Sequence, residues 1–405
     1  MSGRMAADTI DIYDSDEEPQ SPKSKSKHQP QIDAQAVEVT DRLKQCDMSL
    51  TALLKAQELT AAVISYLRIC EVGQLSASAT PAAATARAAQ GCWELLVLGG
   101  AGPPSYHTGV GFQIEIGQWE ELPSMSTRRF GHAAVVLQGL LYVCGGFGSD
   151  ESLRTAERFD PVHSSWELLP QMCIPRHELA AAAVAGALYV CGGRSDPRKA
   201  LRALNTVERF KPSEHRWEVL APMSSQRYGL AAARSSGGSR GQGEQQLYVS
   251  GGADGAGCAL ASSERLDMSK SQGGAWRPVK PMTLQRYGHA LVSIRNRIYA
   301  CGGRGTWRVM SAVESFHPAV GHWEGVPAMV MGRYAFAAVA IAGSLYVCGG
   351  NDSGGHSLSA AERYDPDSKR WEILPAMPLP RGQVAGAAVV KSSSALDLTS
   401  KNICL

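Results

Sequence analysis

The apolar residues between positions 129 and 172 fall into four short runs. They cover residues 129–137, 140–146, 156–161 and 166–170. Gly, Pro, Asp and Ser separate the runs, which is typical of short β-strands joined by tight turns. We therefore expect a small four-stranded antiparallel sheet in this segment.

The same unit recurs along the chain. A Trp, five residues, a Met, three residues and an Arg occur six times, and successive Trp residues are 47, 51, 59, 47 and 48 positions apart. The triplets begin at Trp119, Trp166, Trp217, Trp276, Trp323 and Trp371. Six glycine pairs end an apolar run, at 99–100, 145–146, 192–193, 251–252, 302–303 and 349–350. Self-similarity at this period indicates a repeat architecture.

One four-stranded sheet of this size cannot bury a core alone, whereas sheets stacked radially cover one another's faces. The fold expected is all-β, a six-bladed β-propeller over residues 91–391. The first unit starts at Trp93 without an Arg-led strand, and the last Arg-led strand lacks a Gly-Gly strand after it. Residues 381–390 should therefore complete the first blade and remove a free sheet edge.

Three segments of the unit resemble the kelch repeat. They are residues 140–146, 156–161 and 166–172, and their motifs recur in order over residues 93–391. The first unit has a different segment at 109–116, and the fourth has Ser250 where four others have Cys and Leu266 where an aromatic is usual. The resemblance implies a six-bladed propeller that binds proteins, often as the substrate receptor of a cullin-type ubiquitin ligase.

Residues 1–36 are polar and carry blocks of charge, which predicts a disordered tail. Ser15 lies beside acidic residues and Ser21 precedes Pro22, so both are candidate phosphorylation sites. An inert solvated tail is the alternative.

Residues 37–75 have a helical apolar pattern. The apolar positions are Leu59, Ala62, Val63, Tyr66, Leu67 and Cys70, with an earlier run after Ser49 as a candidate N-cap. Residues 63–76 resemble the middle of an F-box, although the opening Leu-Pro and the closing elements of that family are absent. A helical hairpin that packs on the propeller or self-associates is the alternative. Residues 76–90 are expected to be a linker, and residues 392–405 a C-terminal tail.

Charge, cysteine content and the absence of long apolar runs argue against several classes of function. The net charge is +2, and residues 91–405 carry +5, which is not the footprint of a nucleic-acid-binding protein. Four of the ten cysteines, Cys144, Cys191, Cys301 and Cys348, occupy one repeat position, which is typical of small core residues. No Cys-x-x-Cys pair, signal-like start or 18-residue apolar run occurs. We expect a cytoplasmic or nuclear protein without a membrane partner.

The binding surface is expected at the rim where two sets of loops meet. A ring of Arg with aromatic side chains suits an acidic protein or peptide, and partner peptides bind over these loops in the kelch receptors that the chain resembles. The connections into the Arg-led strands supply Arg129, Arg176, His177, Arg227, Tyr228, Arg286, Tyr287, Arg333, Tyr334 and Arg381. The loops after the glycine pairs supply Phe147, Arg194, Arg304 and Asn351. A structural role is the alternative for the repeated arginines; Arg194 and Arg304 are not repeated.

No catalytic residue, metal ligand or cofactor is expected, so we do not expect an enzyme. The best acidic cluster is Glu157, Asp160 and His163, but the Glu recurs without the His in other units, which favours an architectural role. His132 and His289 share one repeat position and should lie too far apart to bind one metal. The alternatives to a ligase receptor are a cytoskeletal or signalling scaffold and, less favoured, a propeller metalloenzyme.

Overall fold

The structure is a computed structural model whose described residues are 92–100, 107–195, 202–235, 245–268 and 274–391. All of them belong to the unit Gln90–Leu405. The tail, helical segment and linker predicted for residues 1–90, and the tail predicted for 392–405, lie outside the described residues.

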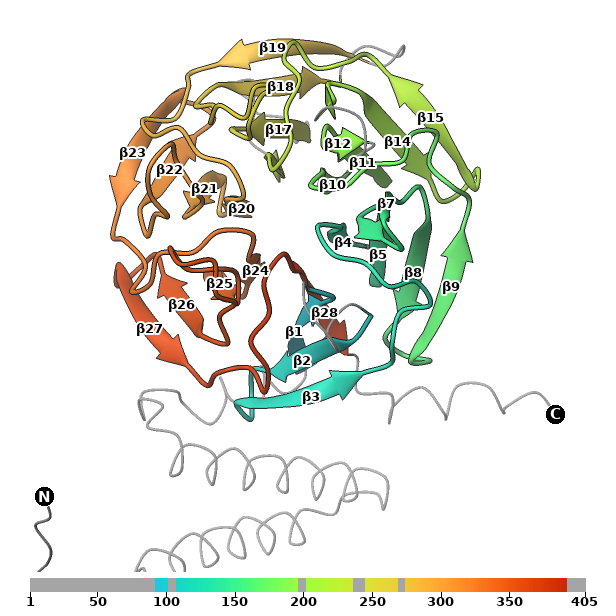
Figure 1. Ribbon diagram of the computed structural model, residues 1–405. Coiled ribbons are helices and arrows are strands. Elements are labelled where there is room, and N and C mark those ends of the chain that lie inside the picture. Colours follow the sequence, from blue (N-terminus) through green and yellow to red (C-terminus); the bar gives the residue numbers. More distant parts are fainter. Residues whose placement is uncertain (1–91, 101–106, 196–201, 236–244, 269–273, 392–405) are drawn as a thin grey trace, which may run out of the picture. The chain divides into compact units, whose positions relative to one another are not determined.

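Six four-stranded antiparallel sheets surround a central axis (Figure 1). From the axis outward, blade 1 contains β28 (Ala385–Lys391), β1 (Cys92–Leu98), β2 (Gly109–Gln113) and β3 (Gln118–Leu122). Blade 2 contains β4 (Ala133–Leu137), β5 (Leu140–Cys144), β8 (Ala156–Asp160) and β9 (Ser165–Leu169). Blade 3 contains β10 (Ala180–Val184), β11 (Ala187–Cys191), β14 (Val207–Lys211) and β15 (Arg216–Leu220).

Blade 4 contains β16 (Ala231–Ser235), β17 (Gln246–Ser250), β18 (Ser263–Asp267) and β19 (Ala275–Val279). Blade 5 contains β20 (Ala290–Ile294), β21 (Arg297–Cys301), β22 (Val313–His317) and β23 (His322–Val326). Blade 6 contains β24 (Ala337–Ile341), β25 (Ser344–Cys348), β26 (Ala361–Asp365) and β27 (Arg370–Leu374). Two short ribbons are β6 (Phe147–Gly148) with β7 (Glu151–Ser152), and β12 (Arg194–Ser195) with β13 (Arg202–Ala203). Every element among the described residues is a strand, and the predicted six-bladed propeller is confirmed.

The ring is closed by strands from both ends of the propeller. β28 pairs antiparallel with β1 from Cys92 opposite Lys391 to Leu98 opposite Ala385. β28 also lies between the innermost strands β24 and β4 of the neighbouring blades. The expected closure by the last Arg-led strand is confirmed, and blade 1 has no free inner edge.

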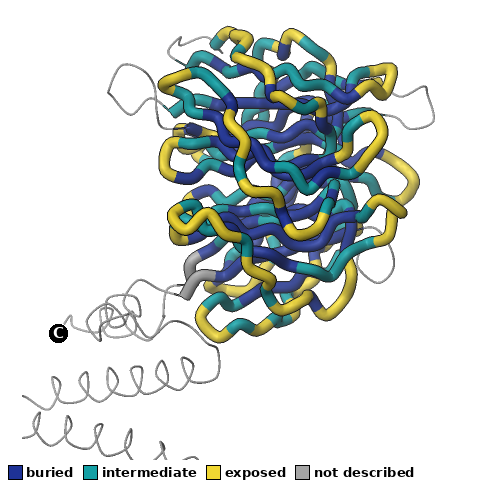
Figure 2. Tube along the Cα trace, turned by 90° about the vertical axis from the view of Figure 1, so that its left-hand side faces the viewer, coloured by how far each residue is buried: buried dark blue, intermediate teal, exposed yellow. Residues whose placement is uncertain are grey.

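The core lies between adjacent blades, where buried strands alternate with exposed loops (Figure 2). One cluster joins Tyr142 and Cys144 of blade 2 to Leu188 and Phe210 of blade 3. Burial raises the pKa of the Cys144 thiol to about 12, so this side chain is a protonated apolar core residue. The equivalent Cys191, Cys301 and Cys348 have pKa values raised to about 12 by the same burial.

The repeated Trp links each blade to the one before it. Trp166 of β9 packs on Phe159 with ring centroids 5.0 Å apart, and its Nε1 donates to the carbonyl of Pro123 in the preceding connection, at 2.9 Å. The other five repeated Trp residues make the same bond, to Pro375, Pro170, Ala221, Lys280 and Pro327. An indole that is apolar on its face and hydrogen-bonded at its edge suits a half-buried interface between blades.

Gly145→Ala is expected to lower the free energy of unfolding by about 2–5 kcal/mol. Gly145 has φ +63°, and a Cβ there would lie 2.5 Å from the carbonyl oxygen of Arg176 in the next connection. Gly139→Ala is the matched control, because Gly139 has φ +78° but no atom within 4 Å of such a Cβ. It should cost about 1–2 kcal/mol from backbone strain alone. Equal losses in urea unfolding of the two variants would contradict the close contact between blades.

Candidate protein-binding rim

One rim of the propeller is formed by the connections that lead into the innermost strands and by the loops after the glycine pairs. We call it the upper rim. In blade 3, His177 and Arg194 exchange two backbone hydrogen bonds of 3.0 and 2.9 Å. Equivalent pairs are Phe130 with Phe147, Tyr228 with Ala253, Tyr287 with Arg304 and Tyr334 with Asn351. The two loop sets meet in five blades, as the sequence predicts.

A belt of backbone hydrogen bonds runs through all six blades just inside this rim. The residue two positions after each repeated Arg has φ between 51° and 59°. These residues are Gly131, Glu178, Gly229, Gly288, Ala335 and Gln383. Each of the middle four donates its N–H to the preceding member, at 2.6 to 2.8 Å. Gln383 and Val384 close the circuit with Gly131 and Ala335, at 3.1 and 3.4 Å. The belt sets the spacing of the rim loops.

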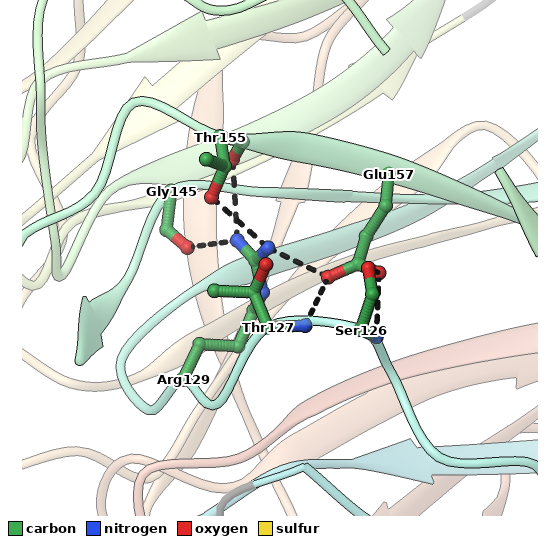
Figure 3. Close-up of polar contacts among 6 residues, drawn as sticks. All are labelled: Ser126, Thr127, Arg129, Gly145, Thr155 and Glu157. Carbon is green, nitrogen blue, oxygen red and sulfur yellow. Dashed lines mark hydrogen bonds and ion pairs between the residues drawn. The ribbon is translucent and has the colours of Figure 1, made fainter. Parts of the chain in front are cut away.

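The repeated arginines lie beneath the rim and bind their own blade (Figure 3). Arg129 donates from Nη1 to the carbonyl of Gly145 at 2.6 Å and from Nη2 to Glu157 at 2.7 Å. Glu157 also accepts from the backbone N–H groups of Ser126 and Thr127, at 2.9 and 3.3 Å. The buried ion pair therefore ties the connection from blade 1 to the third strand of blade 2.

Four other blades repeat this arrangement. The pairs are Arg176–Glu208, Arg227–Glu264, Arg286–Glu314 and Arg333–Glu362, with N···O distances of 2.5 to 2.7 Å. The six arginines Arg129, Arg176, Arg227, Arg286, Arg333 and Arg381 are 0 to 2% exposed. This corrects the expectation that they contact a partner: their guanidinium groups cannot reach one, and they have the structural role that the sequence left open. The architectural role expected for the repeated Glu is confirmed.

Blade 1 lacks the carboxylate. Val110 stands at the second position of β2, where the other blades have Glu, and Arg381 donates instead to Gly99 O, Thr108 O and Thr108 Oγ1 at 3.0 to 3.2 Å. The connection into blade 1 has Pro378 immediately after the repeated Met377. In the other blades this position donates a backbone N–H to the Glu. Proline has no N–H to donate, so the acceptor and the donor are missing together.

A polar cluster joins blades 2, 3 and 4 at the rim. Arg194 Nε donates to His177 Nε2 at 2.8 Å, and Arg194 Nη2 binds Glu178 at 2.7 Å. Because a guanidinium only donates, His177 Nε2 must accept, and its Nδ1–H donates to Ser152 Oγ at 2.9 Å. Burial, followed by the charge of Arg194, lowers the pKa of His177 to about 4. The guanidinium of Arg194 also lies 4.9 Å from the ring centre of Tyr228. Arg194 is thus held in place, with 24% of its side chain exposed.

The hairpin of blade 5, residues 303–310, has different properties. Arg304 is exposed, and its guanidinium lies 5.9 Å from the ring centre of Tyr334. Trp307 at the tip is 94% exposed, and Arg308 beside it is exposed as well. Trp307 is not among the rim residues predicted from the sequence. The signal was available, because Trp93 and Trp307 are the two of the eight Trp residues that fall outside the repeated triplet.

The remaining residues predicted to contact a partner differ in how far their side chains are exposed. His177, Tyr228 and Asn351 are 4, 8 and 6% exposed, so they support the rim loops more than they present side chains. Phe147, Tyr287 and Tyr334 are half-buried at the surface. Phe147, His177, Arg194 and Tyr228 form one cluster, and Arg304 contacts Tyr334. Tyr287 connects the two groups, because its ring centroid lies 6.4 Å from that of Tyr228 and its backbone pairs with Arg304.

Glu157, Asp160 and His163 of blade 2 do not form one cluster. Glu157 is engaged by Arg129, whereas His163 Nδ1 lies 2.7 Å from Asp160 Oδ2 on an exposed turn. Over the described ranges, no three His, Cys, Asp or Glu side chains gather as a metal site. His132 and His289 are each buried, and their rings lie against Gly99 of blade 1 and Gly251 of blade 4, so they occupy different interfaces between blades. No helix in the described part of the chain is long and apolar enough to span a membrane.

A central cavity of about 580 Å³ is lined by residues of all six innermost strands. Its wall is built mainly from Ala, Val and Gly, with Arg234 as its one charged side chain among the described residues. No Asp, Glu, His or Cys of the described residues lines it, so it offers none of the acid–base groups that the metalloenzyme alternative would use.

Comparisons with known proteins agree with this architecture. The family model for the kelch motif matches residues 128–172, 175–224, 285–330 and 332–378, which are blades 2, 3, 5 and 6. Kelch-like protein 25 of Xenopus tropicalis is 26% identical over 197 residues, which is 46% of this chain and 30% of that protein. The solved structure titled "Structure of YjhT" superposes with a TM-score of 0.57 at 15% identity, over 66% of this chain and 91% of that chain. These findings identify kelch repeats in blades 2, 3, 5 and 6 of the propeller.

Proposed function

We propose that this protein is a substrate receptor or adaptor of a cullin-type ubiquitin ligase, which binds a protein or an acidic peptide over the upper rim. The kelch propeller is a protein-interaction module, and its family is generally non-catalytic. The observation that carries the rim assignment is the exposed Arg304 together with the half-buried Phe147, Tyr287 and Tyr334. Backbone hydrogen bonds pair the two sets of loops that carry these residues.

The ligase link is supported by the family and by the sequence before the propeller. Kelch propellers often serve as substrate receptors, and one relative is a kelch-like protein. Residues 63–76 resemble the middle of an F-box, a domain that docks on a ligase adaptor. The ten cysteines suit the cytoplasm or nucleus, where such ligases work.

A scaffold without a ligase link is the second candidate. The match to Kelch-like protein 25 spans less than a third of that protein's length, so the relative lends no support to a ligase-binding segment in this chain. In a scaffold, the same rim would hold a partner without delivering it for modification.

Deletion of residues 49–76 separates the two candidates. If the chain is a ligase receptor, the full chain should co-purify with a cullin and its adaptor, and the deletion variant should lose both proteins. The variant's propeller should keep its thermal midpoint, which serves as the folding control. Absence of cullin from the full-chain purification, or its retention after the deletion, would contradict recruitment through this segment and favour the scaffold.

A further inference from the structure

The blade-5 hairpin is closed by backbone hydrogen bonds and is anchored at its base. Arg304 pairs with Val309 across it, the turn is closed by Gly305 N–H to Arg308 O at 3.0 Å, and Met310 N–H donates to Gly303 O at 2.8 Å. Arg304 exchanges backbone hydrogen bonds of 3.0 and 2.8 Å with Tyr287. Met310 is buried at the base of the hairpin. The tip residues are therefore held in place before any partner arrives, which reduces the entropy cost of binding.

The hairpin leaves the side chain of Trp307 in solvent, although Trp side chains are usually largely buried. Its side chain is 94% exposed, and a loop with the exposed Val330 and Met331 runs beside the hairpin. The path of that loop is shown by Gly332, where a Cβ would lie 3.4 Å from Val309 O. Trp and Arg are the residue types most enriched among the few that dominate binding energy at protein interfaces. The tip of blade 5 thus combines both types on a preorganised support.

The charge of the hairpin indicates the partner's chemistry. Arg304 and Arg308 flank Trp307, and neither guanidinium makes an ion pair or hydrogen bond within the described ranges. The acidic side chain on the neighbouring blade-6 loop, Asp352, is already engaged by the N–H groups of Gly354 and His356, at 2.8 and 2.9 Å. The corresponding loop of blade 2 carries negative charge, because Asp150 and Glu151 are exposed at its tip.

We propose that the blade-5 hairpin is the principal docking point of the rim. It accepts an acidic protein segment that lays one apolar side chain against Trp307 and directs its carboxylates to Arg304 and Arg308. This inference rests on the proposed receptor function and deepens it. Arg194 already pairs with the carboxylate of Glu178 and donates to His177, so the blade-3 cluster supports the rim and does not act as the anchor.

The test uses the full chain and a displayed library of random peptides. Selection on the wild-type chain should enrich acidic peptides that contain an apolar residue, and an enriched peptide is then labelled for fluorescence polarisation. Trp307→Ala should weaken its binding by about 10-fold or more, as expected for a dominant interface residue. Arg304→Ala with Arg308→Ala should weaken it similarly, and should also reduce the salt dependence of binding.

Asp150→Asn with Glu151→Gln on the blade-2 loop is the control, because Asn tolerates the φ of +63° at position 150, and it should leave affinity unchanged within about two-fold. All variants should keep the wild-type thermal midpoint, because the altered side chains are exposed. Enriched peptides that are basic or neutral, or that bind the Trp307→Ala variant as tightly as the wild type, would overturn the inference while leaving the receptor function to its own co-purification test. Failure to enrich any peptide would also overturn it.

Discussion

Glu157→Ala is expected to lower the free energy of unfolding by about 3–5 kcal/mol, because it leaves a buried guanidinium without its counter-charge. The carboxylate and its partner Arg129 are both 0% exposed. The substitution also removes the acceptor for the N–H groups of Ser126 and Thr127, which lie in the connection from blade 1. Urea unfolding of the purified chain, followed by Trp fluorescence, measures the loss.

Glu167→Ala is the matched control in the same blade. Glu167 pairs with Arg158 at 2.7 Å, the same distance as the Arg129–Glu157 pair, but the two side chains are 53 and 31% exposed. An exposed ion pair contributes about 0–1 kcal/mol, so this variant should remain close to the wild type. Comparable losses in the two variants would show that burial does not determine the contribution of these pairs.

Blade 1 shows why the pair is not indispensable in every blade. Val110 leaves Arg381 without a carboxylate, and the guanidinium is satisfied by the carbonyls of Gly99 and Thr108 and by the Thr108 hydroxyl. In blade 2, Ala at position 157 would leave Arg129 with equivalent acceptors. The backbone N–H groups of Ser126 and Thr127, however, would lose their acceptor. Pro378 removes the first of the two equivalent donors in blade 1, and with it part of this cost.

Acidification to about pH 5 is expected to destabilise the propeller through two buried histidines. His132 and His289 are 5 and 6% exposed, and neither ring nitrogen of either has a hydrogen-bond partner among the described residues. Burial, assisted by Arg129, lowers the pKa of His132 to about 3. Burial, assisted by Arg286 and Arg227, lowers the pKa of His289 well below 6.5.

The unfolded chain binds protons to these histidines more tightly than the folded one does. The contribution of the neutral histidines to the free energy of unfolding is therefore fully present above about pH 6.5 and declines as pH falls toward about 3. At pH 5, His132 alone should cost about 2 kcal/mol, and His289 acts in the same direction.

Blades 3 and 4 have Leu179 and Leu230 at the repeat position of His132 and His289. His132→Leu with His289→Leu therefore replaces both histidines by an apolar side chain of similar volume. The double variant should lose less unfolding free energy between pH 7.5 and 5 than the wild type, by about 2 kcal/mol or more. His163→Leu replaces a histidine that is 75% exposed and should follow the wild type. An identical pH dependence in the double variant and the wild type would refute the role of the buried histidines.

Much of the architecture could be predicted from the sequence because it is encoded in period and spacing. The Trp-Met-Arg triplets, the glycine pairs and the incomplete first and last units predicted six blades, their strands and the closure by residues 381–390. Ser250, Leu266 and the shortened first unit also marked blades 4 and 1, which the kelch motif model does not match. Such features are local, and each is visible in a few neighbouring residues.

The exposure of the rim side chains was predicted less well, because repetition does not distinguish exposed from buried residues. A ring of six arginines is equally consistent with a binding surface and with a buried scaffold. Burial depends on where Glu157 and its counterparts lie, about thirty residues further along the chain, and on the carbonyls that face each guanidinium. Trp307 shows the converse. An aromatic side chain is expected in the core, and the hairpin that holds it in solvent is made by pairing across blade 5.

The sequence by itself determined the number of blades, the order of the strands and the way the ring closes, since these follow from hydrophobic periodicity and from which strand each terminus lacks. The tertiary structure decided which charged side chains are buried and which are exposed at the rim. It also decided that Glu178, Ala335 and Gln383 adopt positive φ in the belt, where glycine would be expected. The physical reason is that both outcomes depend on contacts between segments far apart in the sequence, within one blade for the ion pairs and between blades for the belt, and no short window of sequence contains both sides of such a contact.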